Sequence, residues 1–420
     1  MKTRTAIIFL LLASFYYSYA QQQPDTAVVG KNSALNVFLD CNDCDFEYFK
    51  TSFTSVNYVN DVFDADVHIL VTSQPTGGGG VNYSIRLIGK GRYKMMIDTV
   101  TAIIPEDFSA DESRQALLDK IRLGLVPYLL KTPYSDKLFL SIDSSPVMAE
   151  EKDPWKNWVF DISGSCSFSS QKYAESYSLN GSLYVSKITG EIKIESSNYF
   201  AFNESKFSYF SDDTLATYSM SQQDLSSQNL FVKSLGDHFG AGGFTSFGKS
   251  EYSNLDFQMI TGPAVEYNIF SYDEASTRQC RIMYAIMYEH SKYNVVTVYD
   301  KLVDDMLRQD LTINFTYYEP WGTISASAFA TAYLDDLSQY SLGASAIAYF
   351  RLFKGLSLNI SGGIGYCRNQ RSLRQVKGDL DDYLTGQWEM EQGLSYSINI
   401  GVSYRFGSKN NNAVNARFGF

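Results

Sequence analysis

Two cysteines three positions apart are the residues with the clearest capacity for chemistry. Cys41 and Cys44 form a C-x-x-C motif that follows a predicted strand and precedes a predicted helix. This placement is typical of thioredoxin-like redox sites, in which two thiols cycle through a disulfide. No tryptophan precedes the pair and no proline opens a facing strand, so a structural disulfide is the favoured interpretation.

Other candidates for catalysis or ligand binding are few. His68 lies on an apolar segment, where a satisfied core or edge histidine is the favoured interpretation because no second metal ligand has suitable spacing. The four-glycine run at 77–80 lacks the Lys-Ser/Thr pair of a phosphate-binding loop. His290 stands between Glu289 and Ser291, but adjacent residues of a strand point to opposite faces, so these neighbours do not complete a hydrolase triad. We therefore expect no enzymatic activity, no cofactor and no metal site.

Composition and the N-terminus indicate an exported protein rich in strands. The chain has 420 residues, of which 31 are Tyr, 28 are Phe and only 9 are Pro, while 19% are charged. A basic start, an apolar run and the small-x-small sequence Ser18-Tyr19-Ala20 predict a secretory signal peptide at residues 1–20. The formal net charge of -11 argues against nucleic acid as a partner.

Residues 30–150 predict a small α+β domain. Helical spacing at 45–53 and a capping box that begins at Ser109 predict two helices, of which the second runs to about residue 130. Pro127 falls late in this second helix and is expected to kink or end it. Strands are predicted where apolar runs or alternation occur, at residues 34–40, 65–72, 81–88 and 93–104.

Residues 151–420 predict a twelve-stranded antiparallel transmembrane β-barrel, which makes the protein mainly β. From Leu394 to Phe406 every second residue is apolar or aromatic, and the residues between them are small or polar. Such a strand has one face for lipid and one face for a lumen. The segments with this alternation are 157–169, 175–188, 191–205, 222–235, 238–250, 254–270, 279–292, 309–319, 322–334, 338–351, 355–368 and 392–406.

The connections between these segments alternate between short and long. The longest connections follow the third, seventh and eleventh segments, at residues 206–222, 292–309 and 369–391. Tight turns or a moderate connection follow the even-numbered segments. Outer-membrane barrels have short periplasmic turns and long outer loops. Both ends of the barrel, and therefore the first domain, are expected on the periplasmic side.

Charged residues within these segments are expected to face the lumen or to lie at strand ends. A charge on the lipid face near the midplane costs about 2–4 kcal/mol. Two interpretations stay open, namely a paired network that plugs the barrel and a polar conduit of mixed charge. The lumen-facing candidates are Asp161, Lys193, Glu195, Lys233, Asp256, Glu266, Arg281, Glu289, Arg351 and Arg405. Three loop residues, Asp379, Asp381 and Asp382, have carboxylates that suit Ca²⁺. A solvated acidic loop is the favoured interpretation.

Several motifs mark turns and strand ends of this barrel. They are VKSLGDHF at 232–239, VEYNIF at 265–270, EPWG at 319–322, FRLFKGLSL at 350–358 and NNAVNARF at 411–418. With these motifs and the segments 38–45 and 68–80, the chain resembles an uncharacterised Gram-negative family of outer-membrane barrels with an N-terminal periplasmic domain. Its barrel is similar to those of salt-induced outer membrane proteins. The resemblance covers nearly the whole mature chain and implies location and architecture, but no activity.

These features predict an outer-membrane β-barrel protein whose N-terminal domain lies in the periplasm. We expect a non-enzymatic protein whose periplasmic domain binds an unidentified partner. Outer-membrane lipid and the barrel-assembly machinery during biogenesis are the other expected partners. The alternatives are a narrow channel for small polar solutes and, after it, an outer-membrane hydrolase.

Overall fold

The computed structural model describes residues 34–42, 44–133, 135, 138, 153–211, 214–376, 378 and 392–408. The predicted signal peptide, the three loop aspartates considered for Ca²⁺ and the C-terminal motif at 411–418 lie outside these residues. None of the described helices combines the length and the apolar character that a membrane span requires.

The N-terminal domain contains a five-stranded mixed sheet. Its strands are β1 (Leu35–Asp40), β2 (Val56–Tyr58), β3 (Val67–Pro75), β4 (Val81–Gly89) and β5 (Ile97–Ile104). β1 runs parallel to both of its neighbours, and the order across the sheet is β2-β1-β3-β4-β5. The short edge strand β2 was not predicted, and β5 begins later than predicted because Gly91–Tyr93 form a 3₁₀ turn.

Two helices cover one face of this sheet, α2 (Phe46–Ser52) and α3 (Ala110–Leu129). The predicted capping box is present, because the side chains and backbones of Ser109 and Glu112 bond reciprocally. α3 ends two residues after Pro127, in the region where the sequence predicted an end or a kink. The domain core between helices and sheet includes Leu35, Val37, Phe49, Ile85, Leu87, Leu118 and Leu125.

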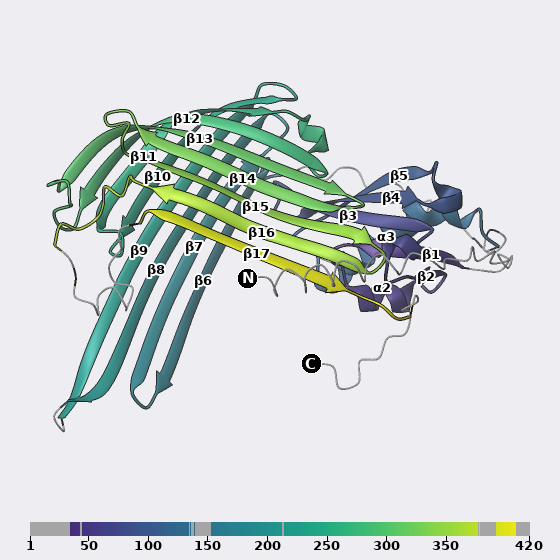
Figure 1. The fold of residues 1–420 in the computed structure, drawn as a ribbon, viewed down its shortest axis with the longest axis horizontal. Helices are drawn as coiled ribbons and strands as arrows, with labels where there is room; N and C mark the ends of the chain where they lie inside the picture. Colours follow the sequence, from purple (N-terminus) through teal and green to yellow (C-terminus); the bar gives the residue numbers. More distant parts are fainter. Residues whose placement is uncertain are drawn as a thin grey trace, which may run out of the picture.

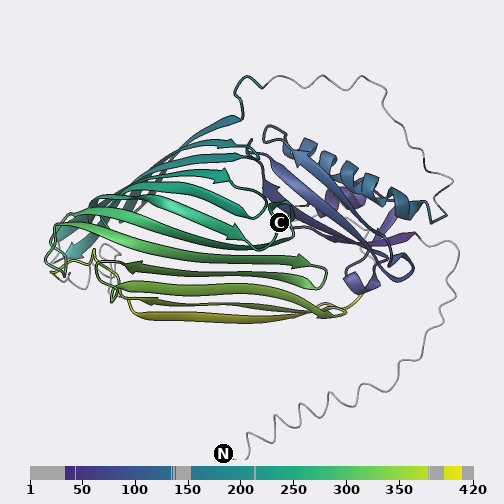
Figure 2. The ribbon, with the colours of Figure 1, turned by 90° about the horizontal axis from the view of Figure 1, so that it is seen from above.

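The opposite face of the small sheet has no covering helix within the described residues. In register, Phe38 lies beside His68, and Asp40 lies beside Leu70, so these side chains share that face. His68 and Leu70 are nevertheless buried, because this face meets one end of a second, larger sheet. Figure 2 shows the N-terminal domain against that end.

The larger sheet is an antiparallel meander in which each strand pairs with the next along the chain (Figure 1). Its strands are β6 (Trp158–Gln171), β7 (Ala174–Ile188), β8 (Ile192–Ser211), β9 (Thr214–Ser234), β10 (Phe239–Ser250), β11 (Leu255–Asn268), β12 (Arg278–Tyr293), β13 (Val303–Glu319), β14 (Gly322–Tyr333), β15 (Tyr340–Phe353), β16 (Leu356–Cys367) and β17 (Leu394–Tyr404). The twelve predicted strands are therefore confirmed. We call the end beside the N-terminal domain the domain end and the opposite end the far end.

Alternation gives the larger sheet two rows of side chains. In β12, Ala285, Met287 and Glu289 are buried, whereas Tyr284 and Ile286 keep 40% and 41% of their surface exposed. We call the face of the buried residues the inner row and the opposite face the outer row. Residues paired across neighbouring strands share a face, so the register assigns the rows throughout the sheet.

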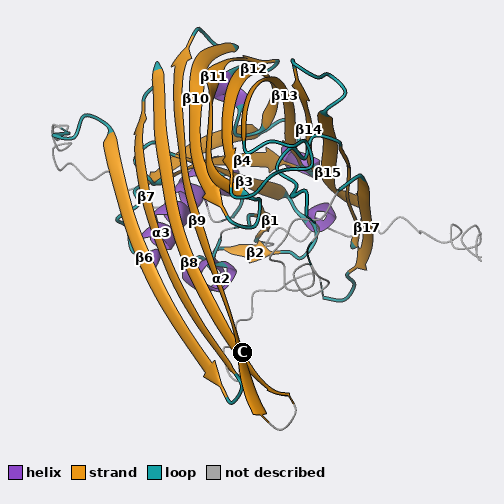
Figure 3. Ribbon diagram, turned by 90° about the vertical axis from the view of Figure 1, so that its left-hand side faces the viewer, coloured by secondary structure: helices purple, strands orange, loops and turns teal. Residues whose placement is uncertain are grey.

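The predicted closed barrel appears as an open, curved sheet. The described residues contain no pairing between the two edge strands, β6 and β17. β10–β17 curl around a common space, whereas β6–β9 diverge from β17 (Figure 1, Figure 3). Twist of about 20–25° per strand pair accumulates across a sheet, and closure requires strand tilt and stagger that match around the ring.

Two predicted far-end loops are shorter in the structure. β8 and β9 pair as far as Ser211 and Thr214, so most of 206–222 is strand and not loop. β12 and β13 likewise take up part of 292–309. Continued pairing satisfies the backbone N–H and C=O groups of these polar segments, which sequence alternation alone does not reveal. The irregularity predicted at Pro263 is an interruption of the β11–β12 pairing at 262–263.

Candidate functional site

A charged cluster centred on Arg351 joins the N-terminal domain to the larger sheet. Arg351 lies on the inner row of β15 at the domain end, and its Nη2 donates to Oδ1 of Asp40 at 2.7 Å. Oδ2 of Asp40 lies 3.0 Å from Nε2 of His68. Nη1 of Arg351 donates to the carbonyl of Pro320 at 3.2 Å, and the guanidinium lies over the ring of Phe38. The cluster therefore links three segments that are far apart in sequence.

The environment of this cluster fixes its protonation state. Burial lowers the pKa of His68 below its ordinary value of about 6.5, and the hydrogen bond to Asp40 offsets this only in part. Burial alone would raise the pKa of Asp40, but the His68 hydrogen bond and the charge of Arg351 lower it overall. At neutral pH a neutral imidazole thus donates Nε2–H to an ionised carboxylate. Nδ1 of His68 is buried without a hydrogen-bond partner, so protonating it would bury an unpaired donor.

Strand ends and short turns of the larger sheet make further contacts with the N-terminal domain. These contacts lie at the domain end, as the ordered connections predicted. The contacting pairs are Asp64 with Lys354 at 2.6 Å, Arg86 with Glu319 at 4.0 Å, and the Gly77 carbonyl with Oγ of Ser186 at 3.4 Å. The backbone N–H of Gly355 also donates to the carboxylate of Asp61. Several strands of the larger sheet therefore hold the domain at this end.

The C-x-x-C motif lies beside this junction. Cys41 and Cys44 are joined by a disulfide directly after β1. Asp45 then accepts a hydrogen bond from the backbone of Tyr48 at 2.9 Å and caps α2. The disulfide therefore sets the turn that follows Asp40, the residue that binds Arg351.

A cavity of about 420 Å³ lies between the disulfide and the inner row of β13–β15. Cys41 and Thr72 line it from the domain, and Tyr318 and Arg351 line it from the larger sheet. Oγ1 of Thr72 is buried without a hydrogen-bond partner. The junction thus has room for water or a small polar solute, and it is not closely packed throughout.

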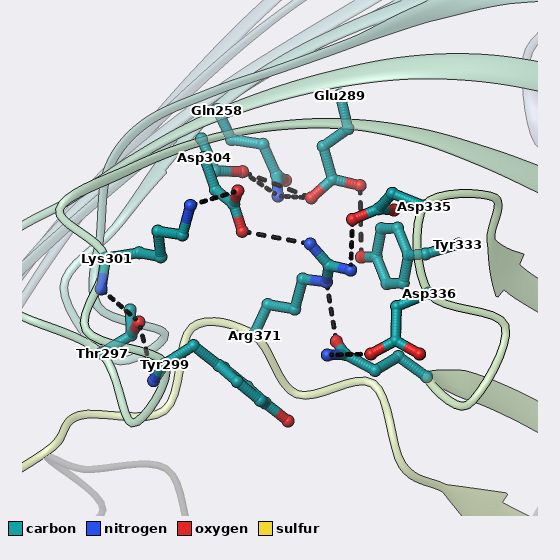
Figure 4. Close-up of polar contacts among 12 residues, drawn as sticks. Gln258, Glu289, Thr297, Tyr299, Lys301, Asp304, Tyr333, Asp335, Asp336 and Arg371 are labelled. Atoms are coloured by element: carbon teal, nitrogen blue, oxygen red, sulfur yellow. Dashed lines mark hydrogen bonds and ion pairs between the residues drawn. The ribbon is translucent and has the colours of Figure 1, made fainter.

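At the far end, the start of the β16–β17 connection folds onto the inner row (Figure 4). Arg371 donates Nη1 to Asp304 at 3.2 Å, Nη2 to Asp335 at 2.8 Å and Nε to Gln339 at 2.7 Å. Its guanidinium also lies over the ring of Tyr333, and only 9% of Arg371 is exposed. This arginine therefore fastens the connection across the far end.

Beside this cluster the inner row carries a paired network. Nη1 of Arg308 donates to Glu289 at 2.8 Å, and Nη2 lies 3.2 Å from Asp310. Gln258 donates to Glu289 at 3.0 Å, and Tyr333 approaches the same carboxylate (Figure 4). Only 4% of Glu289 is exposed, so its negative charge is held by hydrogen bonds and an ion pair. The arrangement matches the plug interpretation better than an open conduit.

The other expected lumen charges are arranged in two groups. In β8, Lys193 and Glu195 lie on the inner row and pair at 2.9 Å, and Tyr184 donates to Glu195 at 3.0 Å. Asp161 of β6 lies opposite Tyr184 in register, so it has the same inner orientation. This group occupies the diverging part of the sheet.

The second group lies on β11 and β12 and just beyond the end of β17. Glu266 accepts a hydrogen bond from Tyr272 at 2.8 Å and lies 3.9 Å from Arg281. Arg405 lies just beyond β17 and lines a second cavity, of about 220 Å³, together with Arg351. Most of the predicted charges therefore lie on the inner row or at its domain end.

Two predicted lumen residues, Lys233 and Asp256, are on the outer side instead. Lys233 lies opposite Ala241 on the outer row, one residue before the end of β9. A long side chain at the end of a strand keeps its charged group in water while its apolar stem lies along the sheet, so this orientation costs little. Asp256 is the extra residue of a β-bulge and binds Lys292 at 2.6 Å. The bulge resets the alternation on which the prediction relied.

His290 and Ser291 do not form a catalytic pair. His290 lies on the outer row, and its Nδ1 is 2.7 Å from Asp305. Ser291 is buried on the inner row and donates to Glu289 at 3.2 Å. Among the residues that the structure describes, no group of three or more His, Cys, Asp or Glu is placed to hold a metal ion.

The sequence did not reveal the junction or the far-end cluster. Asp40 and Arg351 are 311 residues apart, and no local pattern relates them. Asp40 did carry one usable signal, because it shares with Phe38 the face of β1 that the domain core leaves free. Arg371 lies in a connection without periodicity, so its role depends on the tertiary fold.

Comparisons with known proteins give little further information. No protein-family model and no curated protein matches the chain. Matching solved structures include the NanC porin, with 10% identity, a TM-score of 0.27, and coverage of 59% of this chain and 99% of that one. They also include the translocator domain of the autotransporter NalP from Neisseria meningitidis, with 11% identity, a TM-score of 0.17, and coverage of 59% and 80% respectively. Similarity at these TM-scores carries no argument about function, and the family resemblance stays a prediction.

Proposed function

We propose that this chain is an outer-membrane β-barrel protein of the bacterial envelope that anchors its N-terminal domain at the periplasmic mouth. In this proposal β6 pairs with β17 to close the barrel, since an unpaired edge in hydrocarbon would leave backbone N–H and C=O groups without partners. The protein has no catalytic activity, and its domain binds a periplasmic partner. Outer-membrane lipid surrounds the barrel, and the barrel-assembly machinery inserts it.

The observation that carries this proposal is the junction at the domain end. The bare face of the small sheet covers that end through Asp40, whose carboxylate binds Arg351 at 2.7 Å, and through further contacts to neighbouring turns. At the far end Arg371 holds a connection across the inner row. Because other parts of the chain cover both ends of the larger sheet, an anchoring role is favoured and steady conduction of solutes is not.

The free edge of the small sheet supports partner binding by the domain. β5 is the last strand of this sheet, and its N–H and C=O groups on one side have no strand partner within the described residues. On β5, Ile97 is 63% exposed and Ile103 is 71% exposed, and Met95, two residues before the strand, is 94% exposed. Exposed apolar residues along an open strand edge are typical of surfaces that accept a partner segment.

Planar-bilayer recording tests this function against a channel for small polar solutes. We expect the purified full-length chain to insert without conductance steps. A double variant, Arg351→Ala with Lys354→Ala, removes two junction contacts and is expected to raise the frequency of brief openings. The matched control Lys172→Ala changes a lysine in the β6–β7 turn at the far end and should stay silent. Stable conductance of the wild-type chain would establish the channel alternative and overturn the proposal.

The hydrolase alternative has its own test. Esterase and protease activity of the wild-type chain should equal the background of a buffer blank, and His290→Ala should not change it. Activity that His290→Ala abolishes would contradict the non-enzymatic assignment, because His290 lies beside Asp305 as an oriented imidazole would.

A further inference from the structure

One part of the outer row departs from the apolar pattern of a lipid-facing surface. In β17 the outer row consists of apolar and aromatic side chains such as Leu394, Ile398 and Val402. On β8–β11 the outer row instead carries six polar side chains at neighbouring positions, Ser196, Asn198, Ser227, Asn229, Thr245 and Thr261. We call these six residues the polar patch.

The polar patch lies within the apolar band and not at its border. Phe231 follows Asn229 by two residues on the outer row of β9, and Leu225 precedes Ser227 by two. Phe231 is 48% exposed and Leu225 is 55% exposed, so the outer surface is apolar on both sides of the patch along β9. Polar side chains between such residues are costly against lipid and usually have a partner.

A chain of hydrogen bonds connects the patch across neighbouring strands. Asn198 donates to Ser196 at 3.1 Å, and Ser196 donates to Asn229 at 2.7 Å. Asn229 donates to Ser227 at 3.2 Å and to the carbonyl of Thr245 at 3.4 Å. These bonds fix the orientation of both amides.

This series of hydrogen bonds ends at a pair of hydroxyls, and two donors and one acceptor of the patch stay unused. The hydroxyls of Thr245 and Thr261 are 2.8 Å apart, so one donates a hydrogen bond to the other. The accepting hydroxyl can then donate its own O–H to another group. Within the described residues the hydroxyl of Ser227 has no acceptor and Oδ1 of Asn198 has no donor. The patch is therefore uncharged, half-exposed and able both to donate and to accept.

The surface around the patch is hollow. A depression of about 520 Å³ is lined by patch residues together with Gly243 and Pro263. Gly243 has no side chain, and the backbone there is open to close approach. In membranes, small residues beside polar ones are typical of protein–protein contacts, because they let two backbones approach while hydroxyls and amides bond across the interface.

We propose that the polar patch is an interface with a second copy of this chain inside the membrane. A two-fold contact places the same patch on both sides, so it requires a surface that is its own complement. The patch meets this requirement, since it is neutral and its free hydroxyl donors match the free amide acceptor of Asn198 in the other copy. The inference rests on the proposed outer-membrane location, because in water the same residues would be an ordinary polar surface.

Mass determination of the full-length chain in lipid nanodiscs over a range of loading ratios tests the interface. We expect the wild-type chain to form a dimer. Asn229→Leu removes the amide that orients Ser196 and Ser227 for bonds to the other copy, and it should raise the dissociation constant about tenfold, a change that corresponds to about 1.4 kcal/mol. The milder Thr245→Val should weaken the dimer in the same direction. The matched control Gln309→Leu changes an outer-row amide outside the patch and should leave the dimer intact.

Cross-linking gives a readout that does not depend on a weakened variant. With Cys166, Cys280 and Cys367 replaced by serine, Thr245→Cys should form a disulfide-linked dimer under mild oxidation, whereas Gln309→Cys should not. A wild-type chain that inserts but stays monomeric, or an Asn229→Leu dimer as strong as wild type, would overturn the interface. A mass that corresponds to a monomer bound to a different protein, or to a monomer with a tightly held lipid, would also overturn the interface. Protease protection of the sheet in the same samples separates this failure from failure of the proposed membrane location.

Discussion

At the scale of single residues, His68 makes the junction sensitive to acid. Its pKa is lowered by burial, so below about pH 6.5 the unfolded chain takes up a proton that the folded chain resists. The stability that this residue contributes is therefore complete above about pH 6.5 and is lost as the pH falls toward its folded pKa. The lowered pKa of Asp40 acts in the same direction at lower pH. Lys90 and Arg351 add to the effect, because their charges also disfavour a protonated imidazole.

Hydrogen exchange of β1 and β3 in the full-length chain measures this effect. After correction for intrinsic rates, we expect faster exchange at about pH 5.5 than at about pH 7.5. His68→Gln keeps a donor for Asp40 but does not titrate, so its exchange should change much less between these conditions. His238→Gln, at a turn of the larger sheet, should behave as the wild type. Equal or slower wild-type exchange in acid would contradict the assigned neutral state.

The residue scale also separates what sequence can and cannot predict. The apolar run around His68 predicted a satisfied histidine in the core or at an edge. The residue is buried, but on the face that meets the larger sheet, where Nε2 contacts Asp40 and Nδ1 has no partner. The alternation around Arg351 was enough to predict its inner orientation. The bond between Asp40 and Arg351 was beyond prediction, because it depends on how two separate sheets meet.

At the scale of elements, the disulfide couples the turn after β1 to the junction. Closing a four-residue loop is worth about 2 kcal/mol of unfolding free energy in the chain-entropy model. We expect the double variant Cys41→Ser with Cys44→Ser to lose roughly this amount. Pulse proteolysis along a urea gradient measures it, because the unfolded domain is cleaved while the larger sheet is still intact.

A matched cysteine control isolates the role of this bond. Cys166→Ser removes an exposed free cysteine of β6 and should leave the proteolysis midpoint of the domain unchanged. The double variant should also increase cleavage near Asp40 more than cleavage in α3. An unchanged midpoint in the double variant would show that the capping of α2 by Asp45 fixes the turn without the disulfide.

Element prediction succeeded where a strand has one apolar and one polar row. β17 and β16 show such rows over their whole length, and their predicted positions agree with the structure. It failed for β2, which has only three residues and is too short to show a periodicity. It also failed at the far ends of β8 and β9, where pairing continues through polar residues. In these places backbone hydrogen bonding decides the structure, and side-chain periodicity does not report it.

At the scale of the whole molecule, both ends of the larger sheet are covered by other parts of the chain. The N-terminal domain lies at one end and the Arg371 connection at the other (Figure 1, Figure 4). The ordered connections predicted where the domain would lie, because short turns and the chain start had to share one end. They could not predict that the covering face would be the bare side of the small sheet.

Closure of the barrel is the central claim, and Cys166 allows a direct test. β6 starts at the domain end with Trp158, and β17 ends there with Tyr404, so the two edges are antiparallel and both carry apolar residues on the outer row. If Trp158 lies level with Tyr404, Cys166 lies opposite Tyr396, and a small stagger moves this to Ile398 or Ile400.

The decisive measurement is disulfide formation between β6 and β17 in native outer membranes. Single cysteines at Tyr396, Ile398 and Ile400 are each combined with native Cys166, with Cys280 and Cys367 replaced by serine. We predict that at least one combination forms an intramolecular disulfide and that adding Cys166→Ser to it abolishes the bond. A cysteine at the inner-row position Ser397, combined with Cys166 in place of the outer-row cysteines, should form no disulfide. Failure of all three combinations in membrane-inserted protein would contradict the closed barrel and, with it, the proposed function.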